Sequence, residues 1–352
     1  MVFVVSSSMR RLYFMPRASS CPSTVILVVA SLFVSLVVLA EDLGPGALRL
    51  DGTFVQYQSW MLAMDAESWR TELDAMRRAR LKMIILQWTG DGNTPFWTDS
   101  VDPAAIIFDY AAKHGIEVYA GLLKETISSQ AKGTSDPLTE LALRQQKWAE
   151  QVWVRYGSHT CFCGWYIPQE IALTGLPEVA AARFNTYYRE VSTTCKELSQ
   201  GKPVAIAPYF NGQQAPSLIG ADLKRIVAGT GVDVVMLQDG VGARGWDEDV
   251  ERVTPYFEVC RKVCEELGVR LWSDLECFTR DFAPAWIDRI QGQFTTEAAF
   301  VEKFVTFDFF HYMSPQRGAA QKELFGAYLA QFIDQPFRPG VRKEGSSLHA
   351  FE

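Results

Sequence analysis

The chain has 352 residues, of which 48% are apolar and 21% are charged, and this is the composition of an ordinary globular protein. Its formal net charge is −7 and it contains no run of five basic residues, which argues against nucleic acid as a partner. A barrel of about 250 residues with insertions fits this length as one domain, so length alone does not require a second domain.

The first 40 residues differ from the rest of the chain. They contain three arginines and no acidic residue, and an apolar run over residues 25–40 ends in alanine. A basic region, an apolar region and a small residue, in that order, predict an export signal that is cleaved from the mature protein. An uncleaved membrane anchor is the alternative, because the basic side would stay cytoplasmic. We therefore expect a signal peptide or anchor over 1–40, a folded domain over 41–352, and a secreted or cell-surface protein.

Short runs rich in β-branched and aromatic residues recur along the folded domain, and helical patterns separate most of them. Most of these runs are almost continuously apolar, as strands are when both faces of a parallel sheet are buried. In chain order the expected strands are Thr53–Gln58, Met83–Trp88, Glu117–Leu123, Gly164–Gln169, Pro203–Phe210, Val232–Gln238, Val269–Leu275 and Val305–Met313.

The helices between the strands carry clear end signals. An Asp-Pro pair at 102–103 begins one helix and Gly115 ends it, and a second Asp-Pro pair at 136–137 begins the next, which ends at Gly157. Aspartate supplies an N-cap, proline a preset φ, and glycine a left-handed terminus. Residues 318–332 predict the last helix.

Eight strands that alternate with helices predict parallel strands joined by right-handed crossovers. Eight such units favour closure into a single-domain α/β fold, the (β/α)8 TIM barrel, with an open doubly wound sheet as the alternative. A barrel of this kind carries its active site at the carboxyl ends of the strands. The residues that follow each strand are therefore the candidates for function.

Amides, aromatic rings and carboxylates predominate at the expected strand ends, and this set suits a sugar. Amides and acids can bond to hydroxyl groups, and flat aromatic faces can cover a pyranose ring. The plainer alternative is that strand ends are polar because they face water. The candidate stacking residues are Trp88, Tyr166, Tyr209, Trp272 and Tyr312, and the candidate hydroxyl binders are Gln56, Gln87, Gln169, Asn211, Gln238 and Asp239.

Two glutamates stand out as candidate catalytic residues. Glu170 follows the fourth expected strand and Glu276 follows the seventh. Cleavage of a glycosidic bond requires two carboxyl groups, one protonated and one ionised, on either side of the bond. A surface ion pair or a capping role is the alternative for each. Asp274 shares the strand face of Glu276, so it either competes for the role or points into the barrel as a hydrogen-bond partner.

Three segments, 53–56, 84–88 and above all Gly164–Glu170 (GWYIPQE), resemble domain-of-unknown-function family 4434, a family of exported, glycosidase-like barrels. The resemblance extends over about residues 52–332. Glutamates at the ends of strands four and seven are also similar to the clan of retaining (β/α)8 glycosidases. That similarity implies that Glu170 is the acid/base and Glu276 the nucleophile. The clan usually has asparagine before the acid/base, whereas this chain has Gln169.

No metal or cofactor is expected. The chain has four histidines and none is paired at a spacing of two or four, as imidazole ligands often are. His311 is interpreted as a hydrogen-bonded pocket or core residue. The segment Gly240–Gly245 matches the dinucleotide fingerprint G-x-G-x-x-G, but it follows the sixth strand and precedes three acids. A flexible substrate loop is the favoured interpretation.

Two further side chains are candidates for a reactive group. Lys124 ends the third strand and could form a Schiff base, although an ion pair with Glu125 explains both residues. Cys277, beside Glu276, is interpreted as structural with a reactive thiol as the alternative. The six cysteines after residue 40 permit disulfides whose pairing the sequence does not define.

These patterns predict a glycoside hydrolase that acts on a poly- or oligosaccharide, with retention through a covalent intermediate. The first alternative is a non-catalytic barrel that binds glycans at the cell surface, and the second is a Schiff-base lyase that uses Lys124. A carbohydrate is the expected partner, and residues 25–40 are a candidate membrane tether. The sequence leaves open the sugar, the linkage, the mode of cutting and the oligomeric state.

Overall fold

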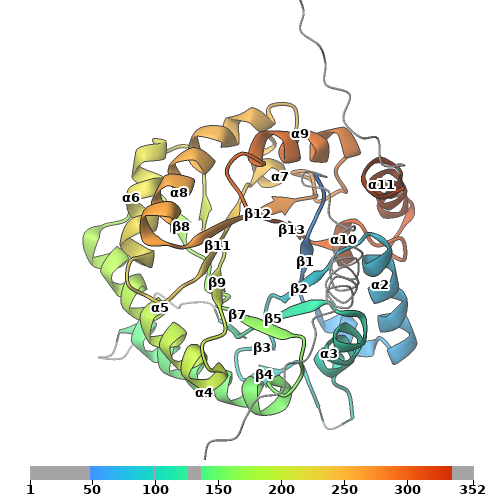
Figure 1. Ribbon diagram of the computed structural model, residues 1–352, viewed down its shortest axis with the longest axis horizontal. Helices are drawn as coiled ribbons and strands as arrows, with labels where there is room; N and C mark the ends of the chain where they lie inside the picture. Colours follow the sequence, from blue (N-terminus) through green and yellow to red (C-terminus); the bar gives the residue numbers. More distant parts are fainter. Residues whose placement is uncertain (1–47, 99, 126–135, 335–352) are drawn as a thin grey trace, which may run out of the picture. The chain divides into compact units, whose positions relative to one another are not determined.

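Eight parallel strands close into a barrel in the computed structural model, which describes residues 48–98, 100–125 and 136–334 (Figure 1). Each strand pairs with the next in the chain, and the last pairs with the first because Thr53 lies opposite Thr306. The predicted (β/α)8 barrel is confirmed and the open sheet is not observed. The barrel strands are β1 (Gly52–Val55), β2 (Met83–Leu86), β5 (Glu117–Gly121), β7 (Phe162–Tyr166), β9 (Val204–Ile206), β11 (Val234–Gln238), β12 (Arg270–Glu276) and β13 (Phe304–Phe307).

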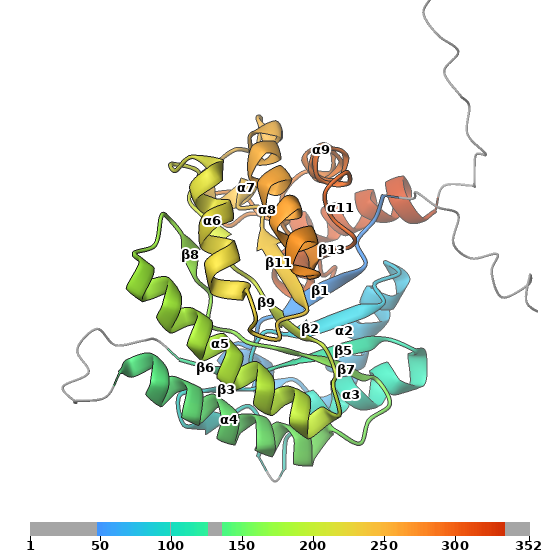
Figure 2. The ribbon, with the colours of Figure 1, turned by 60° about the vertical axis from the view of Figure 1, so that its left-hand side comes forward.

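One long helix follows each barrel strand and packs on the outside of the barrel (Figure 2). These helices are α2 (Ala66–Arg78), α3 (Pro103–His114), α4 (Pro137–Tyr156), α5 (Glu178–Ser199), α6 (Pro216–Val227), α8 (Thr254–Leu267), α9 (Ile287–Glu297) and α11 (Ala319–Tyr328). Short elements occur in the connections. They are η1 (Ser59–Ala63), β3 (Gly90–Asp91), β4 (Thr94–Pro95), β6 (Leu123–Lys124), β8 (Ala172–Leu173), β10 (Tyr209–Phe210), α7 (Val241–Arg244), η2 (Val250–Val253), α10 (Phe309–Tyr312) and the π-helical turn η3 (Leu329–Ile333).

The predicted helix ends agree with the structure, with one exception. Asp102 caps α3 by accepting a hydrogen bond from Ala105 N at 2.9 Å, and Gly115 ends that helix with φ +64°. Gly157 ends α4 but has φ −62°, so it does not supply the expected left-handed terminus. Packing explains why glycine occupies position 157, because a Cβ there would lie 2.5 Å from the ring of Trp153.

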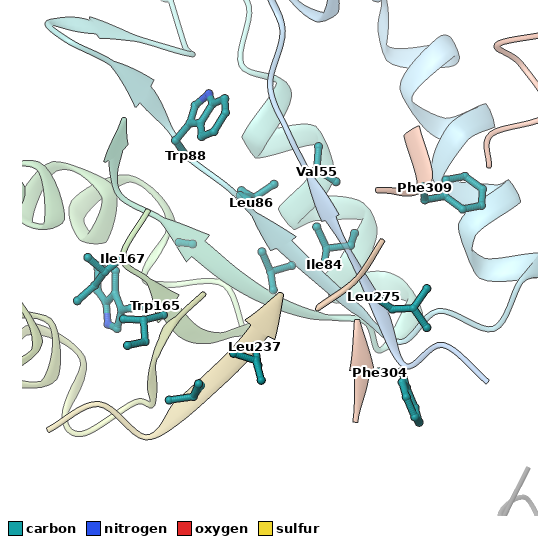
Figure 3. Close-up of a cluster of buried hydrophobic side chains, with 14 of the residues drawn as sticks. Val55, Ile84, Leu86, Trp88, Trp165, Ile167, Leu237, Leu275, Phe304 and Phe309 are labelled. Atoms are coloured by element: carbon teal, nitrogen blue, oxygen red, sulfur yellow. The ribbon is translucent and has the colours of Figure 1, made fainter. Parts of the chain in front are cut away.

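The hydrophobic core has two layers, separated by the barrel wall. Strand residues that point outward pack against the helices, as Val55, Ile84 and Leu86 do in Figure 3. Residues that point inward fill the barrel itself. This inner cluster consists of Phe54, Met83, Ile85, Tyr119, Tyr166, Ala205, Ala207, Val234, Met236, Trp272 and Val305. The interior is thus a packed core without an open channel, as in other barrels of this size.

Trp272 fills the barrel near the amino-terminal ends of its strands. Its side chain is 1% exposed and meets the ring of Tyr119 edge to face at 5.8 Å. Two cations lie against its ring: Lys303 Nζ at 4.9 Å and the guanidinium of Arg270 at 5.4 Å. Because Arg270 begins β12 and Lys303 directly precedes β13, these contacts place Trp272 at the end of the barrel opposite the expected site.

The eighth strand is shorter than predicted. β13 ends at Phe307, and the one-turn helix α10 follows, so His311 and Tyr312 lie on a helix and not on a strand. The reason is local. The side chain of Asp308 accepts a hydrogen bond from His311 N at 2.8 Å and caps this turn. The prediction for residues 308–313 is therefore wrong.

Several expectations concern parts of the chain outside the described residues. The predicted signal peptide or anchor, with the tether at 25–40, is among them. Over residues 48–334, apart from the undescribed gaps, no helix is long and apolar enough to cross a membrane. The six cysteines of this region are free thiols. Cys277 is fully buried and burial raises the pKa of its thiol, which argues against the reactive alternative.

Candidate active site

The carboxyl ends of the strands gather amide and carboxyl side chains at one mouth of the barrel. Alternate residues of a strand point inward, so Asp274 and Glu276 of β12 follow Trp272 on the same inner face. Gln238, directly opposite Asp274 on β11, points the same way. These side chains form the layer above the apolar interior, and the segment after β7 brings Glu170 to it.

A chain of three amides leads across the mouth to Glu170. Gln58 Nε2 donates to Gln56 Oε1 at 2.7 Å, and Gln56 Nε2 donates to Gln87 Oε1 at 2.9 Å. Gln87 Nε2 then donates to Glu170 Oε1 at 3.1 Å. Each amide therefore orients the next, and the last holds the carboxyl of Glu170. Two of the predicted hydroxyl binders, Gln56 and Gln87, belong to this chain.

Glu170 is held from two sides of the mouth. Besides the amide of Gln87, the amide of Gln238 hydrogen-bonds its carboxyl group, and Gln238 Nε2 also donates to Ala207 O at 3.1 Å. Burial raises the pKa of Glu170, and the two amides lower it by a smaller amount. Gln169 beside it has its backbone carbonyl held by Tyr188 OH at 2.9 Å. Glu170 is a fixed carboxyl group that burial favours in its protonated form.

The backbone after Glu170 is anchored by a buried aspartate on α6. Asp222, which is fully buried, accepts hydrogen bonds from the backbone N–H groups of Thr174, Gly175 and Leu176 at 2.7–3.0 Å. Arg225 lies 2.5 Å from the same carboxylate and balances its charge. This tether fixes the loop that leaves the fourth strand, and so it limits movement of Glu170.

Glu276 ends β12 and is 7% exposed. Its Oε2 accepts a hydrogen bond from Ala243 N at 2.7 Å, in the one-turn helix α7. Burial, followed by the negative charge of Asp239, raises its pKa to about 8, while Ala243 N–H and the guanidinium groups of Arg244 and Arg289 act in the opposite direction. The G-x-G-x-x-G segment at 240–245 therefore contributes a hydrogen-bond donor to Glu276.

Asp239 lies behind Glu276 and does not face the mouth. It is fully buried, with Oδ1 accepting from Val241 N at 3.1 Å and Glu276 N at 3.3 Å, and Oδ2 accepting from Gln293 Nε2 at 2.5 Å. The expectation that Asp239 binds a sugar hydroxyl is wrong, because both its oxygens are occupied by groups of the protein. Burial raises its pKa, while three N–H donors and the charge of Arg289 act in the opposite direction.

Asp274 is a buried carboxyl group whose pKa is raised by burial and by the charges of both Glu170 and Glu276. It is 2% exposed, and its Oδ1 has no hydrogen-bond partner among the described residues. Burial raises its pKa well above the usual range, and the next largest effects come from Glu170, Asp239 and Glu276, in that order. Asp274 therefore shares the inward face of Glu276, as expected, but its Oδ1 does not act as the hydrogen-bond partner that one alternative proposed.

Two of the predicted stacking residues lie inside the barrel. Trp272 is sealed at the far end, as described above, and Tyr166 is fully buried with its ring against Phe54 at 5.2 Å. The expectation that these rings stack on a sugar is wrong because neither offers an open face. The hydroxyl of Tyr166 has no partner among the described residues, and the charges of Glu170 and Asp274 act on it. Tyr166 therefore contributes a polar atom below the mouth.

The remaining predicted residues occupy different places around the mouth. Trp88 is 6% exposed and Lys124 Nζ lies 4.5 Å from its ring centre, so one face is covered. Tyr209 is exposed, whereas Asn211 accepts a hydrogen bond from Gln213 N at 2.9 Å and stabilises a turn. Tyr312 stacks on Phe278 at 4.9 Å.

The lysine considered for a Schiff base is paired, though not with its neighbour in sequence. Lys124 Nζ lies 3.4 Å from Asp91 Oδ2 and its side chain is 45% exposed. Glu125 pairs with Arg144 instead. A lysine that is nearly half exposed and paired with a carboxylate is not the desolvated amine that Schiff-base chemistry uses, so these contacts do not favour the lyase alternative.

His311 forms a hydrogen-bonded pair with Asp308 at the mouth, which agrees with its interpretation as a hydrogen-bonded residue, whereas its partner Asp308 was not predicted. His311 Nδ1 lies 2.7 Å from Asp308 Oδ2, and Asp308 is fully buried. Burial lowers the pKa of His311, but the hydrogen bond and charge of Asp308 outweigh it, so the net pKa is raised. The spacing of three in Asp308–His311 could have indicated this pair. No group of three metal-binding side chains occurs in the part of the chain that the structure describes.

The closed barrel of eight parallel strands defines the fold class of the protein, which is a (β/α)8 barrel. The chain belongs to the family described as domain of unknown function DUF4434, whose model matches residues 50–319. The comparison with curated proteins found no match.

Solved structures of similar fold include several proteins named for glycosidase activity. A proposed alpha-L-fucosidase from Bacteroides thetaiotaomicron VPI-5482 is 24% identical, with a TM-score of 0.67 over 82% of this chain and 96% of that one. The endo-beta-1,4-mannanase from Thermotoga petrophila is 14% identical, with a TM-score of 0.59 over 84% and 79%. The GH5_18 protein from Streptomyces cattleya, in complex with GlcNAc, is 13% identical, with a TM-score of 0.53 over 84% and 82%. At these identities the similarity shows the fold.

Proposed function

We propose that the protein hydrolyses glycosidic bonds in a poly- or oligosaccharide, with Glu170 and Glu276 as its catalytic carboxyl pair. The observation that carries the proposal is that Glu170, in the segment after the fourth strand, and Glu276, at the end of the seventh, lie at the same end of the barrel and are held there by hydrogen bonds. Buried carboxyl groups with raised pKa values are costly for the fold and are typical of catalytic sites. The glycosidase names of the structural neighbours are consistent with this class of reaction.

In the proposed reaction Glu170 protonates the leaving glycosidic oxygen while Glu276 attacks the anomeric carbon. The carbon–oxygen bond to the leaving group breaks as the bond to the Glu276 carboxylate forms. Glu170, now ionised, then takes a proton from water, whose oxygen displaces Glu276 and restores both groups. Two inversions give net retention. In this proposal the amides of Gln56, Gln87 and Gln238, which surround the carboxyl group of Glu170, exchange some of their bonds within the protein for bonds to hydroxyl groups of the sugar.

This mechanism requires one proton on the carboxyl pair. The pH dependence of kcat/KM reports the fraction of enzyme that carries one proton on the pair. It is therefore the same whichever glutamate carries that proton. The raised pKa of Glu276, about 8, is therefore expected to set the alkaline limb of the profile. Burial also raises the pKa of Glu170, the other member of the pair.

The test is a screen of the purified chain against a panel of polysaccharides and aryl glycosides, with release of reducing sugar as the readout. The Glu170→Gln variant is the control. We expect at least a 10³-fold loss of turnover in this variant, partly restored by azide on activated substrates. NMR of the first-formed anomer then tests retention. Full activity of Glu170→Gln would refute the assignment.

A non-catalytic glycan-binding barrel is the second candidate. The exposed aromatic ring of Tyr209 at the mouth supports a glycan-binding barrel as much as it supports an enzyme, because both use rings and amides to hold a sugar. A binder does not require both acids. In that case Glu170→Gln keeps the affinity of the wild type and there is no turnover to lose. The same screen separates the two candidates.

We also propose that the protein is exported and either released or tethered through residues 25–40. The support is the basic and then apolar sequence before residue 41. Fractionation of cells that express the full chain, with sequencing of the mature amino terminus, tests it. A cytoplasmic protein with an intact first residue would contradict export.

A further inference from the structure

The most exposed aromatic rings of the described residues all lie beyond the carboxyl ends of barrel strands. Trp60 follows β1, Tyr209 follows β9, and Phe282 and Trp286 follow β12. Their exposed fractions are 39%, 38%, 71% and 43%, respectively. Exposed aromatic surface that gathers at one end of a molecule indicates a binding surface, since water does not favour it. We call these four residues the aromatic rim.

The aromatic rim has members on opposite sides of the mouth. In the order of the barrel strands, β1 and β9 are separated by four steps in either direction, so they lie across from one another (Figure 1). Tyr209 N donates to Ile171 O at 3.0 Å, directly after Glu170, and Tyr209 lies opposite Gln238. One side of the aromatic rim therefore adjoins the proposed acid/base.

The other side adjoins the proposed nucleophile. Phe282 stacks on Phe278 with centroids 5.7 Å apart, and Phe278 stacks on Tyr312 at 4.9 Å. Phe278 lies two residues after Glu276, and a Cβ on Gly242 would meet both the carbonyl oxygen of Phe278 and Oε2 of Glu276, so this stack lies beside Glu276. Phe282 has φ +58°, a conformation that bulky residues rarely adopt and that commonly marks functional sites.

The ring of Trp60 is also fixed from behind. Its edge meets His311 at 6.2 Å and 82°, and the guanidinium of Arg317 lies 4.1 Å from its centre. Arg317 is itself held by Glu72 at 2.6 Å, and His311 by Asp308. A ring fixed in this way loses little conformational entropy on binding, so its exposed surface is pre-organised.

We propose that the aromatic rim binds an uncharged glycan chain that crosses the barrel mouth, with sugar units on both sides of Glu170 and Glu276. Flat rings suit the apolar faces of pyranose units, and the cation that contacts the aromatic rim, Arg317, is already paired with Glu72, so it offers no free partner to a carboxylate or sulfate group. It follows that the protein cuts within chains and does not remove single units from their ends. The cutting rests on the proposed hydrolase function, whereas the binding does not.

Binding is tested with the full chain carrying Glu170→Gln, so that no substrate is consumed. Affinity electrophoresis in gels that contain glucomannan, mixed-linkage β-glucan, xylan or polygalacturonate gives dissociation constants. Trp60→Ala, Tyr209→Ala and Phe282→Ala are added one at a time, and Val154→Ala on the outer face of α4, where the side chain is 87% exposed, is the matched control. We expect each ring removal to weaken binding of one of the neutral chains about 5-fold, from the apolar area lost. The control is expected to bind as before.

Three results would overturn the inference. They are no binding to any neutral chain, equal affinity in all variants, or weakening on one side of the mouth only, which describes a pocket for a chain end. Preference for polygalacturonate would overturn the choice of an uncharged chain. Thermal unfolding of each variant checks that its fold is kept.

Cutting is tested separately with the wild-type chain on whichever neutral polymer binds. Size-exclusion chromatography at early times is expected to show a broad range of oligosaccharides, whereas removal of units from an end would give one small product. Binding without any release of reducing sugar would refute the hydrolase and leave the aromatic rim in place. Release of only single units would refute the crossing chain and leave the hydrolase in place.

Discussion

Replacing Glu276 by glutamine should stabilise the protein while it abolishes turnover. Glutamine keeps the shape of the side chain and an oxygen that can accept the hydrogen bond from Ala243 N. What it removes is an ionisable group whose pKa is raised to about 8, mainly by burial and then by Asp239. The prediction uses only that shift, so it is independent of the substrate.

The sign and size follow from linkage. Below pH 4.5 the group is protonated in both the folded and the unfolded chain and has no effect. From pH 4.5 to about 8 the unfolded chain loses this proton and the folded chain does not, so stability falls as the pH rises, and above pH 8 the loss is constant. Each pH unit in this window corresponds to about 1.4 kcal/mol, so the loss at pH 7 is about 3 kcal/mol.

The Glu276→Gln variant avoids this loss. For a domain of this size, about 3 kcal/mol corresponds to a rise in Tm of about 5 °C at pH 7. At pH 4 we expect no difference between the variant and the wild type. Thermal unfolding followed by circular dichroism between pH 4 and pH 9 measures both, with the exposed Glu248→Gln as the control expected to be neutral at every pH. A variant that is no more stable than the wild type at pH 7, or equally stabilised at pH 4, would refute the reasoning.

Three further predictions concern Asp239, Asp222 and Gly164. Asp239→Asn should lower the pKa of Glu276 by removing a like charge, which moves the alkaline limb of kcat/KM to lower pH; an unmoved limb would contradict the role given to Asp239. Asp222→Ala should destabilise the protein by about 3 kcal/mol in urea unfolding, because three backbone N–H groups lose their acceptor. Gly164→Ala should cost about 1–3 kcal/mol by the same assay, because its Cβ would lie 2.3 Å from the ring of Tyr119; an unchanged midpoint would show that this ring moves freely.

Much of the fold could be predicted because each unit carries its own local signals. Nearly continuous apolar runs predict the strands without knowledge of the rest of the chain. End signals such as the Asp-Pro pairs at 102–103 and 136–137 predict the helices in the same way. The end of the last strand could not be predicted in this way. There Asp308 binds the backbone N–H of His311 and begins a helical turn within a run of residues with high strand propensity.

The site residues were harder to predict, because a side chain reaches the mouth only if it lies near the carboxyl end of its strand and on the inward face of the barrel wall. Trp272 lies four residues before Glu276 on the same face of β12, which is about 13 Å deeper in the barrel at about 3.3 Å per residue. Tyr166 is the last residue of β7, and its ring points into the barrel against Phe54. Asp239 is one residue past Gln238, so it points to the opposite face of the wall. A list of residues near strand ends contains all three, and only the register separates them.

Asp222 has a consequence for recombining this protein with other barrels. It belongs to the fifth strand–helix unit, yet its carboxylate holds the backbone at 174–176 of the fourth. The two units therefore cannot be inherited or exchanged separately. A chimera joined between α5 and β9 would leave either a buried carboxylate without its N–H donors or a loop near Glu170 without its acceptor. Junctions before Phe162 or after Val227 keep donors and acceptor together.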